Sequence, residues 1–184
     1  MENSNLQNII KQFKYYKSLG DKTMEQLTFA ELKKEFAEDA NSISIIAKHM
    51  VGNMLSRWTN FLTEDGEKTW RQRDSEFEDT YNSKEELISE WNKGWGCLFD
   101  ALKSLKEEDL QNIIYIRNEG HTVIDAINRQ LAHYPYHVGQ IVFLGKLIKG
   151  KNWQSLSIPK GKSTIYNKEK FSKEKGKRHF TDNL

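Results

Sequence analysis

Residues 122–149, TVIDAINRQLAHYPYHVGQIVFLGKLIK, carry the clearest helical pattern in the sequence. Apolar residues recur in it at steps of three and four, the spacing that places them on one side of a helix. Thr122 with Asp125 marks a helix start, and Gly150 is typical of the residue just beyond a helix end. The stretch therefore predicts one long amphipathic helix, with an apolar seam made of Ile124, Ile127, Leu131, Tyr134, Val138, Ile141 and Ile148.

Three earlier segments have the same periodicity, at about residues 4–27, 41–62 and 83–105. A capping box over residues 28–31 predicts a short helical turn after the first of them. Four amphipathic helices bury their apolar stripes most simply by packing together. The expected fold class is all-α, a four-helix bundle within residues 1–150.

The remaining segments lack this helical pattern. Residues 63–82 are polar and contain Asp-Gly, which predicts a long loop after the second helix, and loops of this length often form rims of sites. Residues 110–120, LQNIIYIRNEG, are rich in β-branched side chains and favour a short strand or hairpin. We expect residues 151–184 to form a basic, partly disordered C-terminal extension.

Composition limits the class of protein. The chain has 184 residues, the usual size of one domain, with no apolar run long enough to span a membrane and no signal-peptide pattern, so we expect a cytoplasmic protein without a membrane partner. Residues 151–184 carry nine basic and three acidic side chains, but the lysines are interspersed with polar residues, and we expect no nucleic-acid partner. Cys97 is the one cysteine, which favours a buried, inert thiol.

A pair of histidines within the last helix is a candidate for metal binding. His133 and His137 are four residues apart, so a helix projects both imidazoles from the same side. Tyr134 stands where the zinc-protease motif has its general-base Glu, which disfavours peptide hydrolysis. Solvent-facing or hydrogen-bonded histidines are the other interpretation of the pair. Pro135 predicts a kink that aims the two side chains, or else a helix boundary near Tyr134.

His49 is the candidate for a third ligand. It precedes Met50 in the apolar stripe of the 41–62 helix, from which it can face the pair across a bundle core. Three neutral imidazoles leave positions open for water or substrate, as a catalytic site requires, and zinc, nickel or another divalent ion suits imidazole. We leave His121, beside a helix start, and His179, in the basic tail, out of the ligand set.

Three long blocks of the sequence resemble a known family. Together they are similar to the DinB-like (YfiT-like) superfamily of metalloenzymes, and within it to a bacterial subfamily of unknown function, over most of residues 5–165. The resemblance implies a four-helix bundle, commonly a homodimer, with three histidines on a divalent metal, and His49, His133 and His137 occupy the matching places. The blocks are HMVGNMLSRWTNFLTEDGEKTWRQRDSEFED (49–79), INRQLAHYPYHVGQI (127–141) and WQSLSIPKGKS (153–163).

On this resemblance we expect a metal-dependent enzyme that transfers a low-molecular-weight thiol to an electrophilic small molecule, or isomerises one with thiol assistance. The metal would lower the pKa of the cosubstrate's thiol. The alternatives are metal-assisted hydrolysis with a carboxylate from residues 63–82, and a binding or stress-response protein that the metal braces. Asn53 and Gln140 are candidates to orient imidazole N–H groups or a bound water, or are ordinary polar residues. The sequence singles out no catalytic residue.

Overall fold

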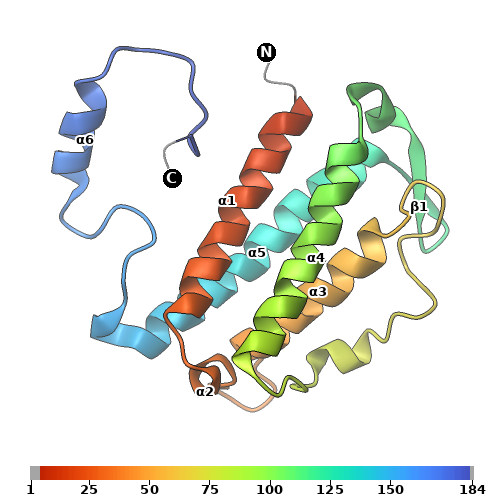
Figure 1. Ribbon diagram of the computed structural model, residues 1–184, viewed down its shortest axis with the longest axis horizontal. Coiled ribbons are helices and arrows are strands. Elements are labelled where there is room, and N and C mark those ends of the chain that lie inside the picture. Colours follow the sequence, from red (N-terminus) through yellow and green to blue (C-terminus); the bar gives the residue numbers. More distant parts are fainter. Residues whose placement is uncertain (1–4, 183–184) are drawn as a thin grey trace.

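The computed structural model describes residues 5–182, a mostly helical chain with one small sheet (Figure 1). The all-α prediction is confirmed in this coarse form. The α-helices of the described part are α1 (Asn5–Glu25), α2 (Phe29–Leu32), α3 (Ile43–Trp58), α4 (Lys84–Ser104), α5 (Val123–Lys149) and α6 (Ser163–Phe171). The other elements are the 3-10 turns η1 (Asp74–Phe77), η2 (Glu107–Gln111) and η3 (Gly150–Asn152) and the strands β1 (Ile113–Ile116) and β2 (Glu119–Thr122).

Hydroxyl caps fix where helices α2 to α5 begin. Each follows a serine or threonine whose side chain accepts a hydrogen bond from the backbone N–H three residues later, which satisfies an amide that the first turn leaves without a partner. The predicted capping box of Thr28 and Glu31 is complete. The capping residues are Thr28, Ser42, Ser83 and Thr122.

Two helix boundaries differ from those considered above. Helix α3 ends at Trp58 rather than near residue 62, because Thr59 is extended and Asn60 has a φ of 46°, a left-handed conformation that asparagine tolerates. Helix α5 continues through Pro135, so a boundary near Tyr134 is wrong. His133 and His137 therefore lie on one continuous helix.

The core lies between the four long helices α1, α3, α4 and α5, which run alongside one another (Figure 1). Trp91, Trp95 and Tyr134 are fully buried there, and each brings a large apolar area to the core. A Cβ atom at Gly94 would lie 3.1 Å from the Val51 Cα, so glycine lets α4 approach α3 closely. This packing gives α3 and α5 fixed positions on either side of the candidate site.

The extended segment predicted within residues 110–120 is the antiparallel β1–β2 hairpin. Arg117 and Asn118 form its turn with φ values of 56° and 61°. Both of their backbone N–H groups donate to the carboxylate of Asp65, each at 2.8 Å, and Gly66 N donates to Tyr115 O at 2.8 Å. The loop after α3 is thereby joined to the hairpin, which brings Arg117 over the site.

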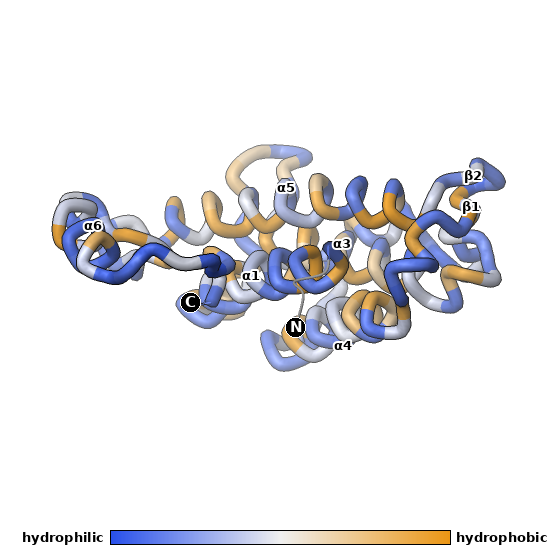
Figure 2. Tube along the Cα trace, turned by 90° about the horizontal axis from the view of Figure 1, so that it is seen from above, coloured by the Kyte–Doolittle hydropathy of each residue, from blue (hydrophilic) through white to orange (hydrophobic). Residues whose placement is uncertain are grey.

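The C-terminal extension contains more regular structure than the sequence predicts. Helix α6 lies within it at one end of the elongated molecule, and the hairpin lies at the other end (Figure 2). None of the α6 residues is buried, so an apolar seam, the signal used for the other helices, could not reveal it. Within residues 5–182 no helix has the length and apolar character needed to cross a membrane.

Candidate metal centre

Two helices bring the three predicted histidines together. His49 projects from α3, and His133 and His137 project from α5, one turn apart. One ring nitrogen from each lies within 4.8 Å of the corresponding atoms of the other two, and the Nε2 atoms of His133 and His137 are 3.0 Å apart. Within residues 5–182, His121 and His179 lie outside this cluster. We call His49, His133 and His137 the triad.

Each imidazole of the triad is held by a side-chain oxygen at its Nδ1 atom. His49 Nδ1 lies 2.9 Å from Glu76 Oε2, His133 Nδ1 lies 3.1 Å from Gln130 Oε1, and His137 Nδ1 lies 2.8 Å from Gln140 Oε1. Carboxylate and amide oxygens accept hydrogen bonds, so each Nδ1 donates, and in the neutral ring Nε2 then keeps its lone pair. Such contacts fix the tautomer and ring orientation of metal-binding histidines.

The surroundings of His133 and His137 favour the neutral imidazole, which is the form that binds a metal. Burial, together with the neighbouring His137 and His49, lowers the pKa of His133 to about 4. Burial also lowers the pKa of His137, although its bond to Gln140 acts in the opposite direction. Burial raises the pKa of Glu76, but hydrogen bonds from His49 and Arg71 outweigh it and leave this pKa below its usual value. Glu76 is therefore ionised where it contacts His49.

The triad fits a divalent cation. Two nitrogens that each lie about 2.0–2.1 Å from one ion are about 2.9 Å apart at a right angle and about 3.3 Å apart at a tetrahedral angle. The observed 3.0 Å between the Nε2 atoms of His133 and His137 falls in this interval. With both Nδ1 atoms donating to amide oxygens, the two Nε2 lone pairs face each other, an arrangement that a cation between them stabilises. The donor set suits zinc, nickel and similar ions and does not choose among them.

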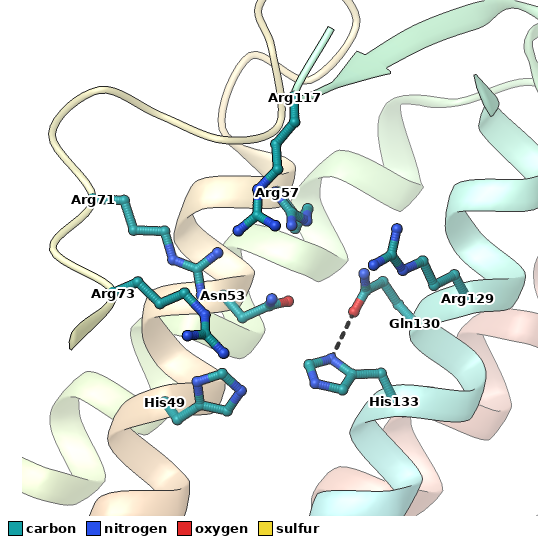
Figure 3. A pocket seen from close by; sticks show the side chains of 9 residues that line it. All are labelled: His49, Asn53, Arg57, Arg71, Arg73, Arg117, Arg129, Gln130 and His133. Carbon is teal, nitrogen blue, oxygen red and sulfur yellow. Dashed lines mark hydrogen bonds between the residues drawn. The ribbon is translucent and has the colours of Figure 1, made fainter. Parts of the chain in front are cut away.

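A cavity of about 220 Å³ lies beside the triad, and His49 and His133 form part of its wall (Figure 3). Asn53 lines it too, but its side-chain oxygen accepts from the Tyr134 hydroxyl at 3.0 Å and not from an imidazole. The Tyr134 hydroxyl in turn accepts from Trp58 Nε1 at 3.1 Å. Of the two candidates for orienting the imidazoles, Gln140 contacts a histidine, and Asn53 instead joins the buried Trp58–Tyr134 pair to the cavity wall.

Comparison with known proteins places the chain in a family. A family model described as a protein of unknown function, DUF1572, matches residues 1–162. The chain belongs to the DUF1572 family. No curated protein and no solved structure matches it.

Several residues of the DUF1572 site escaped the sequence analysis. Gln130 stands three residues before His133, as Gln140 stands three after His137, so the same one-turn criterion would have found it. Glu76 gave no signal, because it lies in a loop without periodicity, although that loop was expected to border a site. The remaining cavity residues are arginines that are distant in sequence, and only the folded chain brings them together.

Proposed function

We propose that this protein is a divalent-metal-dependent enzyme that acts on a small molecule, with His49, His133 and His137 as the metal ligands. The observation that carries the proposal is the convergence of three imidazoles whose Nδ1 atoms are already engaged by oxygens, as metal-binding histidines require. The adjoining cavity supports catalysis rather than a purely structural ion, because it gives a small molecule access to the triad.

We further propose that the chain is a DinB-like four-helix bundle. In this assignment α1, α3, α4 and α5 are the bundle helices, and the triad bridges α3 and α5. The support is the resemblance of the three sequence blocks together with the origin of the ligands, two from one helix and one from another. The same resemblance favours a homodimeric protein, and the three imidazole donors suit zinc or nickel.

The reaction that we favour is thiol transfer to an electrophilic small molecule. A divalent ion at the triad would lower the pKa of a thiol bound to it. The sulfur of the cosubstrate forms a bond to the electrophilic carbon, the leaving group departs with the electrons of its own bond, and the thiol proton passes to solvent. The protein's part is to hold the imidazoles through Glu76, Gln130 and Gln140. Cys97 does not line the cavity, so the thiol comes from the cosubstrate.

Metal-assisted hydrolysis has less support. It calls for a carboxylate from residues 63–82 that can take a proton, and Glu76 is the acidic residue of that loop which reaches the triad. One of its oxygens accepts from His49 and from Arg71, and the other accepts from Arg71 at 2.7 Å. A carboxylate engaged in this way is a poor general base, because those charge-assisted bonds stabilise its ionised form.

Metal analysis of protein purified without an affinity tag tests the proposal. We expect about one zinc or nickel ion per chain in the wild type, loss of most of it in His137→Ala, and no loss in His179→Ala, which removes a histidine outside the triad. Metal-loaded protein should then consume low-molecular-weight thiols when electrophiles are supplied. Equal metal content in all three proteins would overturn the metal site. Metal binding without turnover, accompanied by a strong loss of thermal stability on metal removal, would instead support a bracing role.

A further inference from the structure

The cavity beside the triad collects arginines from four separate parts of the chain (Figure 3). The sequence contains six arginines, and five of them line this one cavity. The sixth, Arg178, is exposed in the C-terminal extension. The five are Arg57 from α3, Arg71 and Arg73 from the loop before η1, Arg117 from the hairpin turn and Arg129 from α5.

Acidic side chains compensate only part of this charge. Glu67 pairs with Arg57 at 3.1 Å, with Arg71 at 3.3 Å and with Arg117 at 3.2 Å. Glu76 pairs with Arg71 at 2.7 Å. Within residues 5–182, the five guanidinium groups of the cavity thus have two carboxylates as ion-pair partners.

Two of the arginines have no carboxylate partner in the described part of the chain. The Arg73 guanidinium lies over the Phe77 ring, 5.4 Å from its centroid, and Arg129 stands across the cavity on α5. Arg57 is only 8% exposed, yet its Nε atom has no hydrogen-bond partner. A buried cation with an unused donor is costly unless another group supplies the acceptor.

The cationic side chains that line the cavity are all arginines, and this choice over lysine indicates the kind of ligand. Lysine is far commoner than arginine in the chain, with 22 lysines to six arginines, but no lysine of residues 5–182 lines the cavity. Arginine offers a planar fork of donors that matches the two oxygens of a carboxylate or phosphoryl group, whereas lysine offers a point charge. General surface basicity would draw on both residue types, so the composition points to recognition of an oxyanion.

We propose that the arginine cavity binds a carboxylate or phosphoryl group of the substrate or cosubstrate and so presents the rest of that molecule to the triad. This inference deepens the proposed function and rests on it for the identity of the reacting end. The volume of about 220 Å³ is below the range of about 300–1,000 Å³ found for pockets of drug-sized ligands. The cavity therefore has the size for a small anionic group such as a carboxylate or phosphoryl group.

Calorimetric titration of the full-length protein, as purified, with malonate and separately with inorganic phosphate tests the inference. We expect at least one of the two probes to bind, and the stronger probe identifies the anion as a carboxylate or a phosphoryl group. Arg73→Gln and Arg129→Gln should each weaken binding about tenfold, as expected for the loss of one charge-assisted contact. Arg178→Gln, which removes the same charge far from the cavity, should leave the affinity unchanged.

The titration is repeated on His137→Ala, and the metal content of every sample is measured. His137 does not line the cavity, so this variant should keep its anion affinity while losing its metal. Absence of binding to the wild type, or equal affinity in the Arg73, Arg129 and Arg178 variants, would overturn the anion site and leave the metal site untouched. Anion binding that is lost in His137→Ala but kept in the arginine variants would also overturn the anion site, because the anion would then bind to the metal and not to the arginines. Unchanged melting temperatures in the arginine variants would show that weaker anion binding comes from the lost contact and not from a loss of folding.

Discussion

Replacement of Glu76 by glutamine would test whether the triad depends on a buried ionic network. The Glu76 residue is 5% exposed, and it joins His49 on α3 to Arg71 in the loop. Glutamine keeps the length of the side chain and an acceptor for the His49 Nδ1–H, but it removes the negative charge opposite Arg71. Arg71 would then keep Glu67 alone as a carboxylate partner, at 3.3 Å.

The size of the effect follows from these contacts. Hydrogen bonds to charged groups contribute about 1.5–3 kcal/mol each, and loss of one partner of a buried ion pair costs about 3–5 kcal/mol. Because Glu67 still compensates part of the Arg71 charge, we expect the free energy of unfolding to fall by about 2–4 kcal/mol. Loss of the carboxylate behind His49 should also weaken metal affinity about 10–100-fold.

Urea unfolding and a competitive metal titration measure the two quantities. Glu108→Gln is the matched control, because Glu108 and its partner Lys106 both have side chains that are 75% exposed. The control should change the free energy of unfolding by less than about 0.5 kcal/mol. A Glu76 variant that equals the control in both assays would refute the view that this network holds the triad.

Three further predictions concern the surroundings of the site. Tyr134→Phe removes the hydroxyl that lies between Trp58 and Asn53 and leaves both of those side chains without this hydrogen-bond partner. The free energy of unfolding, measured in urea, should therefore fall by about 1–3 kcal/mol. An unchanged value would contradict the buried hydrogen-bond network. Burial raises the pKa of Asp65, but hydrogen bonds from three backbone N–H groups outweigh it and leave the pKa below its usual value. The contribution of Asp65 to the free energy of unfolding is therefore complete above about pH 4 and is lost as the pH falls through the folded-state pKa. Asp65→Asn should therefore be less stable at pH 7 and should lose less stability between pH 5 and pH 3, as followed by thermal melts across that range, and parallel curves for variant and wild type would refute this. Zinc at about 100 times its dissociation constant should stabilise the wild type by about 2.7 kcal/mol, or roughly 5–10 °C in melting temperature, and should not shift His137→Ala, where an equal shift would place the ion elsewhere.

The sequence predicted the features that depend on local chemistry. The periodic seam of residues 122–149 and the hydroxyl caps at Thr28 and Thr122 are local signals, and helices lie where they indicated. The histidine cluster could be predicted from the sequence because His133 and His137 are one helical turn apart and His49 lies beside an apolar stripe. These signals are strong because the helix repeat fixes which side chains share a face.

Other features depend on contacts between distant segments and were not accessible from periodicity. Helix α3 stops where Asn60 adopts a left-handed conformation, and the apolar residues beyond it continue the same spacing. Glu76 and Arg117 reach the site through a loop and a hairpin turn whose positions are set by Asp65 and by tertiary packing. Periodicity along the sequence does not reveal which distant segments come into contact in the folded chain.

The candidate site is divided between packed helices and connecting loops. The three histidines of the triad are anchored on the packed helices α3 and α5, whereas Arg71, Arg73 and Arg117 belong to connecting segments. Loops tolerate substitution and changes of length better than packed helices do. Changes in these connecting segments should therefore reshape the arginine cavity while leaving the three histidines in place, within the limit that Glu76 ties one connecting segment to His49.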